Sequence, residues 1–142
     1  MQKIILDTNV LVSALIQKSY PYLIVTELFG GNKVDLCVSK PLMLEYYTVL
    51  RREKFLRYPE FVSNAETLLA DIESRAKLYY PQITLEIIKD FADNRLLELA
   101  EECGAEFLVT GNVNDFTFSN YKGTHIISPK HYYENYLLFY DQ

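Results

Sequence analysis

A short apolar segment close to the start of the chain sets the strongest constraint on its fold. Ile4, Ile5 and Leu6 follow one another without a polar break, and the acid Asp7 ends the run. A strand that is apolar on both faces is typical of a parallel sheet with helices on each side. Lys3–Asp7 therefore predicts a buried parallel strand with a carboxylate at its end.

The rest of the chain alternates helical patterns with further short apolar runs. Helical spacing predicts helices over Val10–Leu15, Leu23–Phe29, Pro41–Leu50, Pro59–Lys77, Asp93–Ala100 and from Pro129 onward. Extended segments are expected at Val34–Val38, Tyr79–Thr84, Glu106–Thr110 and Thr124–Ile127. Because parallel strands need crossover connections, this order predicts an α/β fold with a mainly parallel sheet and helices on both faces.

Small polar residues and glycines mark several helix ends. Ser39 before Pro41 and Ser128 before Pro129 are typical of a capping residue followed by proline in the first helical turn. Gly104 is expected to stop the helix that starts near Asp93. Residues 111–123 are expected to form a polar loop.

Length and composition indicate one compact domain over residues 1–142. The 142 residues are 49% hydrophobic and 23% charged, so the chain buries a core without help from disulfides. The net charge of −5 argues against a broad basic face that coats duplex DNA. A localised nucleic-acid site stays compatible with that charge.

The cysteines and the N-terminal region indicate in which cellular compartment the protein is expected. Cys37 and Cys103 lack the spacing of a metal site, so we interpret them as buried free thiols in a reducing environment, with one disulfide as the alternative. No apolar run reaches the roughly 18 residues of a membrane span. Asp7 interrupts the N-terminus before a signal-peptide core. We therefore expect a cytoplasmic protein without a membrane partner.

Four acids lie where the predicted strands would bring them together. Asp7 ends the first strand, Glu45 lies on the helix after the second, Asp93 begins a helix, and Asp115 follows the strand that ends at Thr110. Ligands of open α/β sheets bind at the carboxyl ends of the strands. Clustered carboxylates repel one another unless a cation or raised pKa values relieve them. All-oxygen ligands favour Mg²⁺ or Mn²⁺ over Zn²⁺.

Each acid also has a structural interpretation. Asp7 could cap a helix, Asp93 could complement a helix dipole, Asp115 could form a turn, and Glu45 could be one of several exposed glutamates. The placement of Asp7 after three buried apolar residues favours a functional role most strongly. For the other three acids, the hypothesis of a functional role rests on the expectation that all four carboxylates lie close together.

Other chemistries match the sequence less well. Asp7-Thr8-Asn9-Val10 is similar to the nucleophile motif of haloacid-dehalogenase phosphatases, but Asn9 stands where that chemistry needs a second acid. The chain has no glycine-rich phosphate or dinucleotide loop. His125 and His131 are its only histidines, so a metal-free histidine nuclease is the remaining competitor.

These residues together resemble the PIN domain family. The opening motif of that family resembles the segment Ile4-Ile5-Leu6-Asp7-Thr8-Asn9-Val10-Leu11-Val12-Ser13-Ala14-Leu15. The third acidic motif of the family resembles Asp93-Asn94-Arg95-Leu96-Leu97-Glu98-Leu99-Ala100. Its last motif resembles Leu108-Val109-Thr110-Gly111-Asn112 together with Asp115-Phe116. Ile126-Ile127-Ser128-Pro129-Lys130 is similar to its closing strand and helix start, so the likeness covers essentially the whole chain.

The resemblance implies a three-layer α/β/α fold and a ribonuclease that depends on Mg²⁺ or Mn²⁺. Asp7, Glu45 and Asp93 match the three core acids, with Glu45 in the loosest motif, and Asp115 matches the less constant fourth. Asn112 stands where many relatives carry an acid, and Asp90 is a further neighbour. Polar groups are implied around the metal or the scissile phosphate at Thr8, Asn9, Thr110 and Asn112.

Substrate contact is expected from a basic group at the end of the third predicted helix. Arg51, Arg52, Lys54 and Arg57 alternate there with Phe55 and Tyr58, on which bases could stack. The alternative is a solvated helix end with cations near its C-terminus.

The chain most resembles toxin components of prokaryotic toxin–antitoxin pairs. That resemblance implies single-stranded RNA as substrate, a small antitoxin protein as partner, and a homodimer or higher homo-oligomer. Some of the apolar side chains among Tyr20, Tyr22, Leu23, Leu44, Tyr46, Tyr47, Phe55 and Tyr58 are expected to face outward and bind the partner. The alternative function is a module that binds RNA or protein without cutting, its metal site being degenerate.

Overall fold

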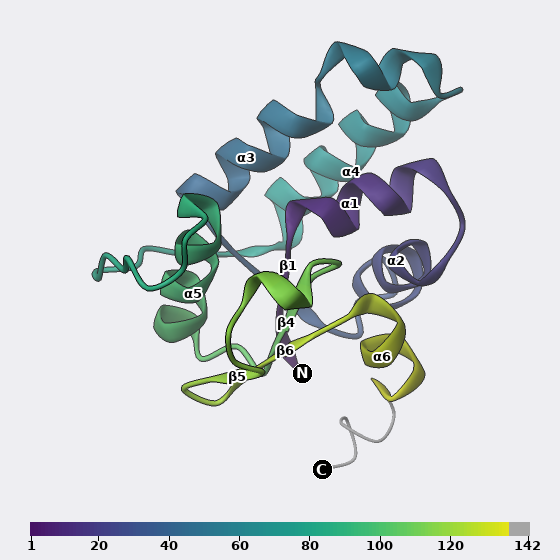
Figure 1. Ribbon diagram of the computed structural model, residues 1–142. Helices are drawn as coiled ribbons and strands as arrows, with labels where there is room; N and C mark the ends of the chain where they lie inside the picture. Colours follow the sequence, from purple (N-terminus) through teal and green to yellow (C-terminus); the bar gives the residue numbers. More distant parts are fainter. Residues whose placement is uncertain (137–142) are drawn as a thin grey trace.

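A six-stranded sheet runs through residues 1–136, the part of the chain that the computed structural model describes (Figure 1). The strand order is β3-β2-β1-β4-β6-β5. The strands are β1 (Lys3–Leu6), β2 (Asp35–Ser39), β3 (Lys77–Tyr79), β4 (Phe107–Val109), β5 (Asn120–Tyr121) and β6 (Thr124–Ile127). All neighbours pair in parallel except β5 and β6, so the prediction of a mainly parallel sheet is confirmed.

Helices cover both faces of this sheet and make the three-layer fold expected from the sequence. They are α1 (Thr8–Ile16), α2 (Tyr20–Leu23), α3 (Lys40–Leu50), α4 (Phe61–Arg75), α5 (Phe91–Cys103) and α6 (Pro129–Glu134). α1, α3 and α4 pack on one another, while α5 packs against β1, β2 and β3. Figure 1 shows α5 across the strands from α1 and α4. Right-handed crossovers explain this division, because the chain turns back at β3 and crosses to β4 through α5.

The parallel register brings the ends of three strands to one edge. Leu6 of β1 pairs with Val109 of β4, and β1 also pairs with β2 on its other side. The ladder continues one residue further, because the Asp7 amide donates to the Val109 carbonyl over 3.0 Å. Asp7, the start of α3 and the loop after β4 therefore meet at the carboxyl edge of the sheet.

The core forms where the sequence predicts it. Ile4, Ile5 and Leu6 are fully buried in β1. Cys37 and Cys103 are also buried, and neither is in a disulfide. Within residues 1–136, no helix combines the length and the apolar character needed to cross a membrane.

Helix starts follow the expected chemistry at two sites and differ at a third. The Ser39 hydroxyl accepts from the Leu42 amide over 3.3 Å, and the Ser128 hydroxyl accepts from the His131 amide over 3.2 Å. α5 begins earlier than predicted, because the Asp90 carboxylate caps it by accepting from the Ala92 amide over 2.9 Å.

Two predicted segments are wrong in their boundaries or type, and two short turns lie where no element is predicted. β3 lies at Lys77–Tyr79, whereas the extended segment was expected at Tyr79–Thr84. The helix predicted over Leu23–Phe29 begins at Tyr20 and continues as a π-helical turn, η1 (Ile24–Phe29). Short 3₁₀ turns that the apolar pattern does not signal lie at η2 (Glu53–Arg57) and η3 (Val113–Asp115).

The expected polar loop over residues 111–123 also contains a hairpin strand. β5 pairs with β6 through a two-residue turn at Lys122 and Gly123, with φ values of 49° and 94°. Two positive φ values match the right-handed twist of a hairpin, but this turn usually carries Asn-Gly. Because Lys122 stands where asparagine is usual, the sequence does not predict this turn.

Candidate functional site

Asp7 lies at the centre of the carboxyl edge and is held by two side chains. The Thr110 hydroxyl donates to Asp7 Oδ2 over 2.8 Å, and the Asn9 amide group donates to the same oxygen over 3.3 Å. Burial is the largest influence on this carboxyl and raises its pKa, while the Thr110 hydrogen bond opposes the rise. Asp7 is therefore an oriented carboxylate that burial makes costly to ionise.

A second set of bonds joins the start of α1 to the loop after β4. Asn9 Oδ1 accepts from the Gly111 amide over 3.0 Å, and Thr110 Oγ1 accepts from the Asn112 amide over 3.0 Å. A Cβ at position 111 would lie 3.4 Å from Asn9 Oδ1, an ordinary van der Waals contact, so the hydrogen bond of the Gly111 amide holds this approach. The two chain segments that flank Asp7 are thus fixed to each other.

Glu45 reaches the same edge from α3. Burial raises the pKa of its carboxyl, the charge of Asp7 raises it further, and Thr8 and Arg52 lower it. The next residue anchors the helix, because the buried Tyr46 hydroxyl donates to the Leu6 carbonyl over 2.5 Å. That bond joins α3 to the residue before Asp7, so Glu45 and Asp7 keep their relative position.

Asp93 lies in the first turn of α5 and is the most perturbed of the acids. Its side chain is only 7% exposed, and its Oδ2 atom has no hydrogen-bond partner within residues 1–136. Burial is the main reason that the pKa of Asp93 rises to about 6, and the charges of Asp7, Asp90, Asp115 and Glu45 add to the rise. A buried acceptor without a donor is costly, and a cation or a proton would relieve it.

Asp115 and Asp90 complete the group from two exposed positions. Asp115 ends η3 in the loop after β4, and its charge raises the pKa of both Asp7 and Asp93. Asp90 caps α5 and raises the pKa of Asp7, Glu45 and Asp93. The structure thus brings all four sequence-predicted acids, with Asp90 as a fifth, into one mutually repelling group. We call this group, made of Asp7, Glu45, Asp90, Asp93 and Asp115, the acid cluster.

Polar side chains of α5 hold the segment that precedes it. Asn94 Oδ1 accepts from the amides of Ile87 and Ile88 over 3.0 and 2.9 Å. Glu98 Oε2 accepts from the Leu85 amide over 2.6 Å and pairs with Arg95. Asn94 and Glu98 are buried, which the apolar pattern did not reveal, because their role is to satisfy backbone groups of an irregular segment. They fix the position of Asp90 and Asp93.

The acid cluster is not a closed metal cage as it stands. Within residues 1–136, no three His, Cys, Asp or Glu side chains form a ready set of metal ligands. The chemistry of the residues nevertheless fits a hard divalent cation, since the cluster offers carboxylate oxygens and includes the unpartnered Asp93 Oδ2. An ion would also offset the repulsion that raises the pKa values.

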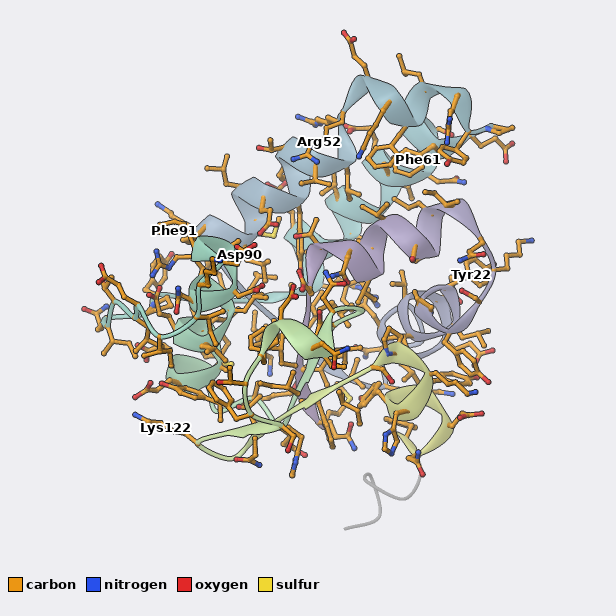
Figure 2. The ribbon with its side chains drawn as sticks, in the orientation of Figure 1. Tyr22, Arg52, Phe61, Asp90, Phe91 and Lys122 are labelled. Carbon is orange, nitrogen blue, oxygen red and sulfur yellow. The ribbon has the colours of Figure 1, made fainter. Side chains whose placement is uncertain are left out.

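Arg51 and Arg52, two of the basic residues expected to contact the substrate, lie in different surroundings. Arg51 makes a two-bond ion pair with Glu66, over 2.8 and 2.9 Å, and its guanidinium packs 4.6 Å from the centre of the Tyr47 ring. Arg52 is exposed and close enough to Glu45 to lower the pKa of that carboxyl. Figure 2 shows Arg52 near the end of α3. Of the two, Arg52 is the one whose charge acts on the acid cluster.

The outward-facing apolar surface differs from expectation in its members. Tyr46 and Phe55 are buried, and Phe55 stacks on Phe61 with ring centres 4.5 Å apart, so neither forms a partner surface. Tyr20, Tyr22, Leu23, Tyr47 and Tyr58 are half-buried. Leu44, next to Glu45, is 69% exposed and is the one member of the expected set that faces fully outward.

A family model described as a PIN domain matches residues 3–114, well over half of the chain. The matched region contains Asp7, Glu45 and Asp93 and ends one residue before Asp115. No curated protein matches the chain.

Proposed function

Because the chain belongs to the PIN domain family, whose members are commonly nucleases, we propose that it is a Mg²⁺- or Mn²⁺-dependent endoribonuclease acting on single-stranded RNA. One observation carries the proposal beyond the family. Asp93 is buried with an unpartnered carboxylate oxygen among four other acids, an arrangement that favours a bound cation.

The divalent ion would be held by four carboxylates of the acid cluster, those of Asp7, Glu45, Asp93 and Asp115. When bound, a divalent ion neutralises phosphate charge and makes a water molecule more acidic, which supplies the chemistry of phosphodiester hydrolysis. No side chain of the cluster then needs to act as a nucleophile. Asp90 adds negative charge to the site in this proposal.

The surrounding polar residues position the carboxylates and the substrate. The Thr110 hydroxyl donates a hydrogen bond to Asp7, and its oxygen accepts one from the Asn112 amide. Asn9 orients Asp7 from the other side through its side-chain amide. Arg52 brings a positive charge to the Glu45 end of the cluster, where it would attract a phosphate group of the RNA.

A cleavage assay tests the proposal directly. A mixed pool of single-stranded RNAs is incubated with the protein in Mn²⁺, in Mg²⁺ and in EDTA, and Asp93→Asn serves as the inactive control. We expect internal cleavage with either metal and none in EDTA or with the variant. RNA that binds but stays intact in both metals would instead support the non-cleaving module.

We further propose that this ribonuclease is a toxin that a small antitoxin protein holds inactive. The exposed Leu44, which precedes Glu45 on α3, supports this, because it offers an apolar contact for an amphipathic helix. A basic side chain of that helix would enter the cluster. Co-expression with the product of the adjacent gene, followed by pull-down and growth measurements, tests the idea; normal growth with the chain alone and no captured partner would contradict it.

A further inference from the structure

The first residue of α5 is an aromatic side chain that packing does not hide. Phe91 is 73% exposed, although it follows Asp90 directly and precedes Asp93 by two positions. Figure 2 shows Phe91 and Asp90 together at the start of α5. A large apolar ring that stays in water beside a functional site commonly marks a binding surface.

One side of the Phe91 ring is supported by a fixed cation. The Arg95 guanidinium carbon lies 4.2 Å from the centre of the ring. Arg95 is itself held in place, because it donates to the Leu85 carbonyl over 2.9 Å and pairs with Glu98. With Arg95 on one side and 73% of the residue exposed, the opposite face of the ring is open to solvent.

A hollow lined in part by Arg95, the cation that packs on Phe91, contains further groups suited to nucleic acid. Its volume is about 310 Å³, and Arg95, Lys40, Tyr79 and Tyr80 contribute to its lining. Lys40 begins α3, the helix that carries Glu45, and both Lys40 and Tyr80 are exposed. Arg95 Nε is buried and has no hydrogen-bond partner within residues 1–136. Two tyrosines and two cations therefore lie together at the ends of β2 and β3, where they share the hollow with the Glu98 carboxylate.

From this arrangement we propose that the open face of Phe91 stacks on a base of the single-stranded RNA, while Lys40 contacts a backbone phosphate. The proposal deepens the proposed function, on which it rests for RNA as the ligand. Stacking on aromatic rings between cations is how single strands are held without sequence-specific contacts. This mode of binding suits a chain with a net charge of −5, because such a chain cannot rely on a broad basic surface to attract RNA.

Phe91 lies on the opposite flank from Asp115. α5 packs against β1, β2 and β3, whereas Asp115 follows β4, on the other side of β1. An RNA strand stacked on Phe91 would therefore cross the acid cluster on its way toward the Asp115 loop. Phe91 thus sets where the strand lies relative to the carboxylates.

Fluorescence of a labelled RNA tests the proposal. Ten-nucleotide RNAs carry 2-aminopurine at successive positions and are titrated with the Asp7→Asn protein, which is expected to bind without cutting. We expect quenching at one or two positions. Phe91→Ala should remove that quenching and weaken binding about tenfold. Phe91→Tyr should keep both signals, and Phe91→Leu, which is apolar without a π face, should lose the quenching.

A matched control separates stacking from a general loss of apolar surface. Val62 on α4 is 50% exposed, so Val62→Ala removes an exposed apolar side chain away from α5. We expect RNA binding to be unchanged in that variant. Melting temperatures of all variants should stay close to that of the parent, because none of these side chains is buried.

The binding and cleavage measurements distinguish a failure of the Phe91 proposal from a failure of the nuclease proposal. Unchanged binding and quenching in Phe91→Ala overturn the proposal, as does equal weakening by Val62→Ala or a failure of the parent to bind any of the RNAs. If Phe91→Ala abolishes quenching but the wild-type chain never cleaves RNA in Mn²⁺, the stacking assignment stands and the nuclease assignment fails.

Discussion

The Thr110 hydroxyl donates a 2.8 Å hydrogen bond to the Asp7 carboxylate across 103 positions of sequence. This bond links the end of β4 to the end of β1 at the point where the acid cluster forms. It also opposes the effect of burial on the pKa of Asp7, so it favours the ionised form that binds a cation. The carboxylate is therefore oriented and kept acidic by a residue that is not itself an acid.

Replacing Thr110 by valine is expected to weaken metal use, because it removes the donor to Asp7 and also the acceptor of the Asn112 amide. Thr110→Val removes the donor, so the pKa of Asp7 should rise further and cleavage should fall about 10- to 100-fold. Thr110→Ser keeps the hydroxyl and should stay near wild type. The rate is measured against Mn²⁺ concentration. If Thr110→Val needs no more Mn²⁺ than the wild type, the orienting role of Thr110 is wrong.

Removing single charges from the cluster should stop cleavage and leave the fold intact. Asp7→Asn and Asp93→Asn each delete a proposed metal ligand and relieve repulsion among carboxylates, so cleavage should drop by at least about 100-fold while the melting temperature does not fall. Glu102→Gln, an exposed acid on the same helix as Asp93, is the control. Wild-type cleavage by either cluster variant in Mn²⁺ would remove the metal-site assignment.

The raised pKa of Asp93 predicts how its variant changes stability with pH. The folded chain holds this proton up to about pH 6, whereas the ordinary pKa is 3.8, so the folded state binds more protons than the unfolded state between these values. In the metal-free protein, the unfolding free energy should therefore fall as pH rises from about 4 to about 7. The decrease should be at most about 3 kcal/mol.

Asp93→Asn lacks this titration, so it should be more stable than the wild type at pH 8 and similar to it at pH 4. Chemical denaturation in EDTA at both pH values measures the difference. A stability gain that is equal at the two pH values would show that the ionisation of Asp93 is not its source.

The histidines should not be needed for the chemistry. His125 lies on β6 with its ring 3.3 Å from the Asn120 side chain, and His131 lies in α6, neither of them among the acids. The double variant His125→Gln, His131→Gln should keep most of the cleavage rate, and EDTA should abolish it in both proteins. Cleavage that survives EDTA and disappears in the double variant would establish a metal-free nuclease instead.

The sequence predicted the parts of the structure that local chemistry controls. Ile4, Ile5 and Leu6 signal a strand buried on both faces, and Asp7 follows it because the chain leaves the core at that point. Ser39 and Ser128 signal helix starts through their hydroxyls. Parallel pairing then made it possible to expect that Asp7 and the loop after Thr110 would meet.

The features that escaped prediction depend on tertiary contacts. Asn94 and Glu98 occupy a helix that was expected to be amphipathic, yet they are buried because they satisfy amides of residues 85–88. Glu66, fifteen positions from Arg51, determines the surroundings of that arginine. The exposure of Phe91 also has no local signal, because an aromatic residue at a helix start is as readily buried as exposed.

The order of strands in the sheet has a consequence during synthesis. β4 lies between β1 and β6, but it comes after β2 and β3 in the chain. A nascent chain that has emerged only as far as α5 can pair β3, β2 and β1, yet it lacks Thr110 and Asp115. Asp7 then has no partner across the sheet edge, so the acid cluster is assembled only after the ribosome has made most of the protein. Under the proposed function, the growing polypeptide would therefore be harmless to RNA until β4 inserts.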